Sequence, residues 1–147
     1  MMMNTKSNKS YIQKRREGRI IAFQTLFAYN FNSKTLDELF KWDWLIKKYS
    51  NESLEYAKFL IKGTIENLNI IDKKIKSKLK NWDFSRISNI DKAILRFSIF
   101  SMFFETDLPE KVIINEAVEI VKNFGTEDSY KFINGILDAL KRSKNTD

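Results

Sequence analysis

Two short groups of residues in this 147-residue sequence have the types and spacing needed to bind a polyanion. The first consists of Arg15, Arg16 and Arg19. Arg15 and Arg19 stand four residues apart, so a helix would place both on one face, and Glu17 is the only acidic residue between them. Like charges this close, near the positive end of a helix dipole, are unfavourable until a phosphate backbone binds them, which arginine can do bidentately. The alternative is a solvated or frayed arm.

The second group is Lys131 and Phe132. On a helical wheel at about 100° per residue, Phe132 falls at the rim of an apolar face and Lys131 lies beyond it. An aromatic ring beside a lysine suits a stacked base with a phosphate on the ammonium, and such stacking contributes about 1–3 kcal/mol. Asp128, one turn earlier, is expected to stabilise the helix start and to restrain nucleic-acid affinity by repelling phosphate. The alternative is that Phe132 only widens a core face made by Ile133, Ile136, Leu137 and Leu140.

The rest of the composition offers little other chemistry. The sequence contains no Cys and no His, which excludes disulfides, thiol nucleophiles, imidazole bases and zinc sites built from those residues. No glycine-rich phosphate loop or tight cluster of acids stands out, so we expect neither an enzyme nor a cofactor. The net charge of +7 lies largely in residues 1–19, which favours nucleic acid as a partner. A second basic group either contacts nucleic acid or only solubilises a surface: Lys73, Lys74, Lys76, Lys78 and Lys80.

The elements that position these residues are predicted to be helices. The sequence has 12 Phe and 43% hydrophobic residues but only 4 Gly and 1 Pro, too few for the turns of an all-β protein. Ser10 with Gln13, Thr35 with Glu38, and Ser50 or Asn51 predict helix starts. The helices that follow are expected to end at residues 32–33, to cover 36–49, and to run from 51 to about 79 with an interruption at Asn69. Within the last of these, Gly63 is expected to let two helices approach closely.

The C-terminal half is predicted in the same way. Ser88 with Asp91 opens a central buried helix over 90–104, after a polar connector at 81–89 that Trp82 and Phe84 anchor to the core. Asp107 and Pro109 begin the next helix, which ends at a left-handed Gly125, and Thr126 caps the last one. We count six or seven helices and no strand, in one domain over 1–147 with residues 1–9 flexible and 142–147 frayed. No apolar run approaches the roughly 20 residues of a membrane span, and the N-terminus is not a secretory signal, so we expect a cytoplasmic protein without membrane contact.

Two segments resemble the NusB family of bacterial transcription antitermination factors. The first, RREGRIIAFQTLFAYNF at 15–31, is similar to that family's arginine-rich first helix, although Glu17 and Gly18 depart from a more uniformly basic run. The second, DKAILRFSIFSMFFETDLPEKVIINEAVEIVKNFGTEDSYKFINGILDAL at 91–140, resembles the family's C-terminal signature, with INEA, FG-x-EDS and KF-x-NG-x-LD in order. Residues 33–85 match only in helical character. Together the two segments cover about half of the chain.

The resemblance implies an all-α fold in which two small helical bundles pack across a long helix. It also implies that the protein binds a short single-stranded boxA-type RNA together with NusE, a ribosomal protein of the small subunit. The complex would then modify RNA polymerase so that transcription of ribosomal RNA resists termination. In this setting Arg15, Arg16, Arg19, Lys131 and Phe132 are expected to contact RNA, with Asp128 modulating the affinity.

The resemblance also assigns two residues to the protein partner. Phe27 stands where the family commonly has Tyr, and Asp91 stands where it has an acid, so both are expected to face NusE. The alternatives are that Phe27 is ordinary core and that Asp91 serves only the helix start at Ser88. Tyr130 replaces a His common in the family, so a histidine contact there is lost or altered. Apolar residues at the rim are equally suited to a homodimer that hides the RNA surface until NusE binds.

Two other functions are alternatives for a helical chain of this kind. RNA cytosine methyltransferases of the RsmB type begin with a similar helical domain, but they continue into a catalytic domain with Cys, whereas this sequence ends at Asp147 and contains no Cys. A helical adaptor that binds protein only is the second alternative. RNA binding with a steep salt dependence would separate RNA recognition from that adaptor role.

Overall fold

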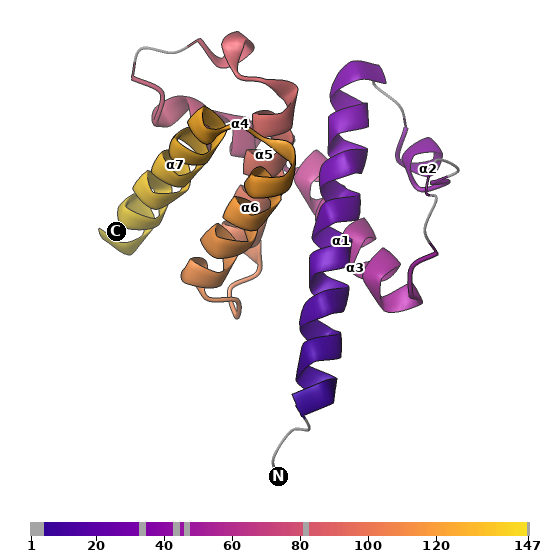
Figure 1. The fold of residues 1–147 in the computed structure, drawn as a ribbon. Helices are drawn as coiled ribbons and strands as arrows, with labels where there is room; N and C mark the ends of the chain where they lie inside the picture. The colour runs from indigo at the N-terminus through magenta and orange to yellow at the C-terminus, as the bar shows by residue number, and fades with distance from the viewer. Residues whose placement is uncertain (1–4, 33–34, 43–44, 46–47, 81–82, 147) are drawn as a thin grey trace. The chain divides into compact units, whose positions relative to one another are not determined.

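The prediction of an all-helical protein is confirmed by a computed structural model of the chain, in which no described residue forms a strand (Figure 1). The structure describes residues 5–32, 35–42, 45, 48–80 and 83–146. These residues form seven α-helices and one short 3₁₀ helix, η1: α1 (Thr5–Asn32), α2 (Leu36–Leu39), α3 (Asn51–Glu66), α4 (Leu68–Ser77), η1 (Phe84–Arg86), α5 (Asn89–Phe104), α6 (Glu110–Phe124) and α7 (Glu127–Thr146). None of the described helices is both long enough and apolar enough to cross a membrane.

Hydroxyl groups begin several of these helices where the sequence predicted it. Ser50 Oγ accepts a hydrogen bond of 3.2 Å from the backbone N–H of Ser53 at the start of α3. Ser88 Oγ accepts from Asp91 N–H at 3.1 Å, and Thr126 Oγ1 accepts from Ser129 N–H at 3.1 Å. Thr35 makes the corresponding bond to Glu38 N–H at 3.4 Å. Each satisfies a backbone donor that has no partner within its own helix, so these starts were readable from local chemistry.

The predicted start of the first helix is wrong. α1 begins at Thr5, so residues 5–9, which were expected to be flexible, are helical and Ser10 lies inside the helix. Gln13 Nε2 donates to Glu17 Oε1 at 3.4 Å, one turn ahead, instead of reaching back toward Ser10. Residues 5–9 contain neither Pro nor Gly, so nothing in them opposes extension of the helix past a cap-like serine. The predicted end at residues 32–33 agrees with Asn32.

The second helix is much shorter than predicted. α2 covers four residues, and of the predicted remainder residues 43, 44, 46 and 47 lie outside the described part of the chain. Trp42 has a positive φ of 48°, and its indole Nε1 donates to Thr25 Oγ1 of α1 at 3.0 Å. Burial of this ring, which is 9% exposed, outweighs the local helix preference of the segment, because a large aromatic side chain loses much apolar area from water on packing.

Three further helix boundaries differ in detail. The break after α3 falls at Asn67 rather than Asn69, and Asn67 Nδ2 donates to the carbonyl of Gly63 at 2.8 Å. Pro109, not Asp107, is the residue that precedes α6, and no side chain caps that helix. Gly125 is extended, with φ −108° and ψ −169°, rather than left-handed. In addition, α7 continues to Thr146, beyond the point where fraying was expected.

The chain divides into two compact units, Met1–Lys62 and Gly63–Asp147, which are described separately. In the first unit α1 packs against the N-terminal part of α3, with Gly18 of α1 next to Ser53 and Tyr56 of α3. A Cβ atom added at Gly18 would lie 2.8 Å from Tyr56 Cδ2 and 3.0 Å from the carbonyl oxygen of Ser53. Gly18 is therefore required by close packing of the two helices.

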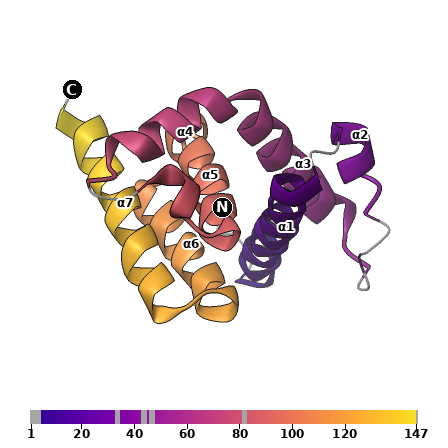
Figure 2. The same ribbon diagram turned by 90° about the horizontal axis from the view of Figure 1, so that it is seen from above.

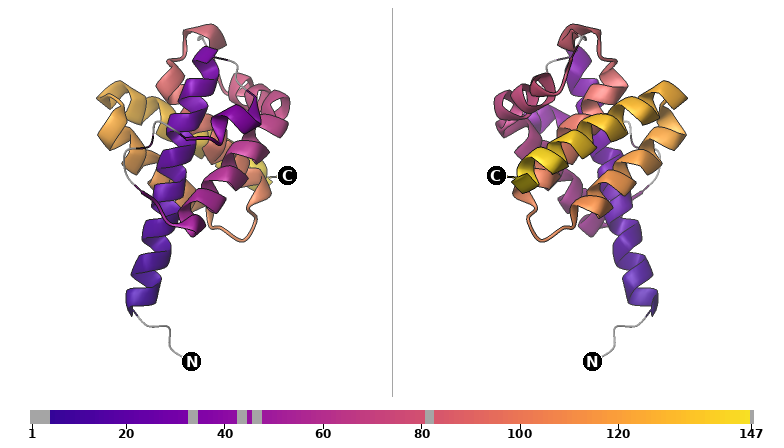
Figure 3. Two further views of the ribbon diagram at one scale, coloured as in Figure 1. Left: turned by 90° about the vertical axis from the view of Figure 1, so that its right-hand side faces the viewer. Right: turned by 90° about the vertical axis from the view of Figure 1, so that its left-hand side faces the viewer.

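In the second unit α5, α6 and α7 pack against one another, and α4 packs against α5 (Figure 2). α6 and α7 run in opposite directions from the turn that joins them (Figure 3). α5 is buried over most of its length, and the predicted core face of α7 is confirmed because Ile133, Ile136, Leu137 and Leu140 are all buried. The ring of Phe100 on α5 occupies the place that a side chain at Gly63 would need, which confirms the predicted close approach. Arg96 binds Asp72 through two hydrogen bonds of 2.9 Å and ties α5 to α4.

Candidate nucleic-acid interface

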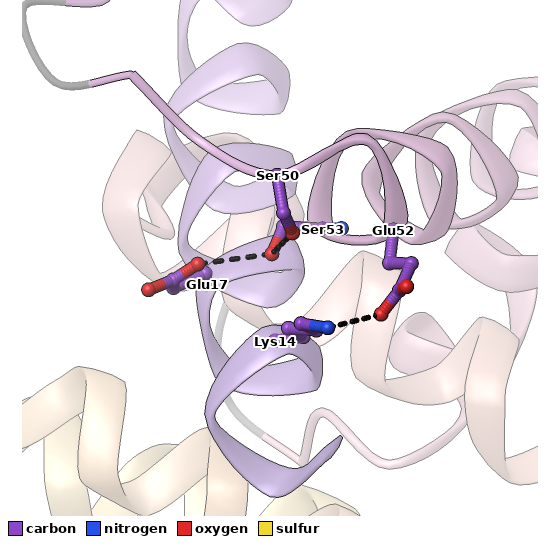
Figure 4. A network of polar contacts seen from close by, with 5 residues as sticks. All are labelled: Lys14, Glu17, Ser50, Glu52 and Ser53. Atoms are coloured by element: carbon purple, nitrogen blue, oxygen red, sulfur yellow. Dashed lines mark hydrogen bonds and ion pairs between the residues drawn. The ribbon is translucent and has the colours of Figure 1, made fainter. Parts of the chain in front are cut away.

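The arginine-rich segment of α1 is held against the start of α3 by polar contacts (Figure 4). Glu17 Oε2 accepts a hydrogen bond of 2.9 Å from Ser53 Oγ, and Lys14 forms an ion pair with Glu52. Gly18 follows Glu17 directly and lies at the close approach to Ser53 and Tyr56 described above. The two residues that interrupt the basic run, Glu17 and Gly18, therefore serve the packing of α1 on α3.

The arginines of this segment differ in exposure. Arg15 and Arg19 share the ring of Tyr56, with the guanidinium carbons 4.1 and 5.4 Å from its centroid, which confirms that they occupy one face of the helix. Arg19 is only 6% exposed, and its Nη2 donates to the hydroxyl of Tyr56 at 3.3 Å. Arg15 is half-buried, and Arg16 is exposed. Arg15 and Arg16 are thus the residues that can present a guanidinium to a phosphate, whereas Arg19 lies in the interior.

A pocket of about 810 Å³ lies where the starts of α5 and α7 meet the end of α6 in the second unit. Asp128 and Lys131 on its wall are exposed and Phe132 is half-buried, as the helical wheel predicted. Asp91, expected to face the protein partner, lines the same pocket. The full lining consists of Arg86, Ile87, Ser88, Ile90, Asp91, Phe124, Gly125, Thr126, Asp128, Ser129, Lys131 and Phe132.

Asp91 is the most unusual group in this pocket. The residue is 8% exposed, and its Oδ1 atom is buried without a hydrogen-bond partner among the described residues. Burial raises the pKa of the Asp91 carboxyl, and the hydroxyls of Ser129 and Ser88 counteract that shift without satisfying Oδ1. A buried acceptor without a partner lowers the stability of the folded state, so a hydrogen-bond donor or a cation that reached Oδ1 would bind favourably there.

Several pocket residues were not identified from the sequence. Arg86 and Phe124 are exposed at its margin, and Ser129 is buried beside Asp91. A local signal existed for Ser129, because Thr126 and Ser129 form the start of the helix that carries Lys131. No local signal placed Arg86 there, since it depends on how residues 83–88 fold back to the start of α5.

Phe27, the other residue expected at the partner surface, lies in the first unit. It is half-buried, and its ring centroid lies 6.5 Å from that of Phe23 in a tilted arrangement. This position is compatible with a residue that completes the packing of α1 and still leaves part of its ring accessible. Its role toward a partner therefore stays a prediction.

Comparison with known proteins shows the family to which the chain belongs. The model of the NusB family matches residues 16–142. A transcription antitermination protein NusB from Treponema denticola is 43% identical over 129 residues, which covers 86% of this chain and 95% of that protein. The solved structure of T. maritima NusB superposes with a TM-score of 0.79 at 38% identity, covering 87% of this chain and 90% of that one.

A solved complex is also similar. The crystal structure of the antitermination factors NusB and NusE with double-stranded RNA contains a chain that superposes with a TM-score of 0.79 at 25% identity, covering 89% of this chain and 98% of that one. The all-helical fold, the family match over most of the sequence and the relatives lead to one conclusion. The chain belongs to the NusB family of transcription antitermination factors, which are not enzymes.

Proposed function

We propose that the protein binds boxA-type single-stranded RNA together with NusE and promotes read-through of ribosomal RNA operons as part of an antitermination complex on RNA polymerase in the cytoplasm. Family membership supports the general role. The observation that carries the RNA-binding part is the pocket in which exposed Lys131 stands next to half-buried Phe132.

Each side chain at the pocket has a distinct role in this proposal. The Lys131 ammonium meets a phosphate, and it forms no hydrogen bond or ion pair that would occupy it within the described residues. The ring of Phe132 stacks on a base at the pocket margin. Asp128 repels the adjacent phosphate and keeps the RNA affinity below its maximum.

The arginine-rich segment contributes separately. Arg15 and Arg16 bind the phosphate backbone, and their contact is electrostatic and independent of sequence. Arg19 acts as a positioning residue, because it holds the Tyr56 ring on which Arg15 also lies. Glu17 fixes this part of α1 to α3 through Ser53.

The protein partner is assigned to Asp91 and Phe27. The unsatisfied Oδ1 of Asp91 would accept a hydrogen bond or ion pair from a cationic side chain of NusE, which offsets the cost of burying the carboxylate. A second copy of this chain is the competing occupant of such a surface. Sedimentation of the protein with and without NusE distinguishes a homodimer from a heterodimer.

One titration tests the proposal as a whole. A boxA-type RNA is titrated into the protein alone, into NusE alone and into the mixture, at several salt concentrations. We expect the tightest binding in the mixture, with an affinity that falls steeply as salt rises. Binding to NusE but not to RNA, with no change when Arg15 and Arg16 are replaced by Ala, would instead identify a protein-only adaptor. Binding to neither component would refute the proposal.

Asp128 gives a sharper test of the pocket. The Asp128→Asn variant removes one negative charge beside the proposed phosphate position and keeps the shape of the side chain. We expect it to bind boxA-type RNA more tightly at fixed salt, by a few-fold, because an exposed charge interaction contributes about 0.2–1 kcal/mol. Glu119→Gln on α6, an exposed acid outside the pocket lining, is the control of equal charge change. An unchanged or weaker affinity of Asp128→Asn would remove Asp128 from the RNA surface.

A further inference from the structure

Three cationic groups surround the ring of Phe84 in the second unit. The ammonium nitrogens of Lys76 and Lys92 lie 4.9 and 4.7 Å from the ring centroid, and the Arg96 guanidinium carbon lies 5.8 Å from it. We call these four residues the Phe84 cluster. Cations this close to an aromatic ring are attracted by its quadrupole. The ring therefore holds three positively charged groups together despite their mutual repulsion.

The charge of the Phe84 cluster is only partly compensated. Asp72 is engaged by Arg96 through two hydrogen bonds, and the Asp83 carboxylate accepts the backbone N–H of Ser85 at 3.1 Å. Neither Lys76 nor Lys92 forms an ion pair with any residue that the structure describes. Burial, followed by repulsion from Arg96, lowers the pKa of Lys92, although Asp72 and Asp83 act in the opposite direction. The ammonium groups of Lys76 and Lys92 therefore share one ring without an ion pair to any described residue, although Asp72 and Asp83 lie close enough to Lys92 to act on it.

The Phe84 cluster and the pocket of Lys131 and Phe132 are built partly from the same segments of the chain. Phe84 and Arg86 are the first and last residues of η1, and Arg86 lines the pocket. Lys92 follows Asp91, which forms part of the pocket wall. The pocket and the Phe84 cluster therefore share η1 and the first turn of α5.

We propose that the Phe84 cluster is a second RNA-backbone site, at which Lys76 and Lys92 bind phosphates of nucleotides that flank the segment held in the pocket. This inference rests on the proposed RNA-binding function and extends it. It gives one member of the lysine-rich segment 73–80 a function, because Lys76 faces the cluster. Lys74 is excluded from it, since its ammonium lies 3.9 Å from the centroid of a different ring, that of Phe103.

The test compares two RNA lengths on matched variants. The probes are a boxA-type RNA and the same RNA extended by a short oligouridine tract at its 5′ or its 3′ end. The variants are Lys76→Gln with Lys92→Gln, and Lys76→Gln alone, which changes only an exposed side chain and so spares the fold. Lys111→Gln is the matched control, an exposed lysine near the start of α6, at the end of the antiparallel α5–α6 pair away from η1.

We expect one of the extended RNAs to bind the unaltered protein several-fold more tightly than the short RNA. The double variant should lose this advantage and bind the short RNA as before, and the log–log salt slope for the extended RNA should fall by about 0.7 for each lysine removed. Lys76→Gln should show half of that change and Lys111→Gln none.

Three results would overturn the inference. One is an extension that gives no advantage at either end of the RNA while the short RNA still binds, which leaves the pocket proposal intact. Another is a double variant that binds NusE more weakly and RNA unchanged, which would make the Phe84 cluster a protein contact. The third is a short RNA that does not bind at all, which removes the proposed function and this inference with it.

Discussion

Arg19 in α1 and Lys131 in α7 are both basic residues within a run that suggests RNA binding, yet the structure uses them differently. Arg19 is buried against Tyr56 and hydrogen-bonded to its hydroxyl, whereas Lys131 is exposed at the edge of a pocket. The same contrast holds for the neighbouring residues. In α1 Glu17 and Gly18 contact α3, while in α7 Phe132 and Asp128 line a pocket. Charge density along a sequence thus does not separate packing from binding.

Replacing Gly18 or Gly135 by Ala gives the largest expected difference in stability between the two regions. Gly18→Ala places a Cβ against Tyr56 and a backbone carbonyl, and overpacking of this kind costs about 1–3 kcal/mol. Gly135→Ala on α7 meets nothing within 4 Å, so we expect a gain of about 0.5–1 kcal/mol from helix propensity. Chemical denaturation of both variants measures the contrast. Equal effects of the same sign would show that α1 is not tightly packed on α3.

Phe132 decides whether the pocket of α7 binds RNA or only extends the core. Phe132→Leu keeps an apolar side chain but removes the aromatic face, so we expect RNA affinity to fall by about 1–3 kcal/mol in binding free energy with little change in stability. Phe132→Tyr keeps the ring and is expected to bind RNA normally. If Phe132→Leu lowers the unfolding temperature and leaves RNA affinity unchanged, the residue is a core residue.

Arg19 and Arg16 test the contrast within α1 itself. Arg19→Ala loses a buried hydrogen bond and a cation–π contact, together about 1–2 kcal/mol of stability. Arg16→Ala is expected to leave stability unchanged and to lower RNA affinity, with a salt slope reduced by about 0.7. Thermal unfolding and RNA titration on the same two variants measure both quantities. The distinction fails if Arg16→Ala destabilises the protein as much as Arg19→Ala does.

The smallest effect is expected from Asp91, and it depends on pH. Because burial raises the pKa of Asp91 above its ordinary value of 3.8, the folded state holds a proton that the unfolded state has already lost. The contribution of this carboxyl to the free energy of unfolding therefore falls as pH rises from 3.8 to the raised pKa of the folded state. At neutral pH the contribution is unfavourable. We expect Asp91→Asn to be more stable than the unaltered protein at neutral pH, equally stable below pH 3.8, and weaker in binding NusE. Denaturation curves across this pH range would contradict the prediction if the two proteins differed by a constant amount.

Much of the fold was predictable because its signals are local. The hydrogen bond that Ser88 accepts and the helical periodicity of apolar residues on α7 both involve neighbours within one or two turns. The short α2 was not predictable, because it reflects burial of Trp42 against Thr25, 17 residues earlier in the sequence. Local propensity favours a helix through this segment, and tertiary packing overrides it.

The candidate site likewise has features that local sequence predicts and features that depend on tertiary packing. The exposure of Lys131 and the rim position of Phe132 follow from the periodicity of a single helix. The burial of Arg19 depends on Tyr56, 37 residues away, and the presence of Asp91 and Lys131 in one pocket depends on how α5 packs against α7. Contacts of that sequence separation carry no signature in a single sequence, so the difference in exposure between the arginines could be seen only in the structure.

The Tyr56 ring also has a thermodynamic consequence for the arginines that lie on it. An arginine on a flexible stem loses about 2 kcal/mol of side-chain conformational entropy when a ligand immobilises it. The guanidinium of Arg15 is held 4.1 Å from the Tyr56 centroid and 4.9 Å from that of Tyr11 before any RNA arrives. Part of this ordering is completed during folding, while N–H groups at the edge of the guanidinium plane stay available as donors. In the proposed RNA complex, Tyr56 would thus preorganise the phosphate contact of Arg15 without itself touching the phosphate.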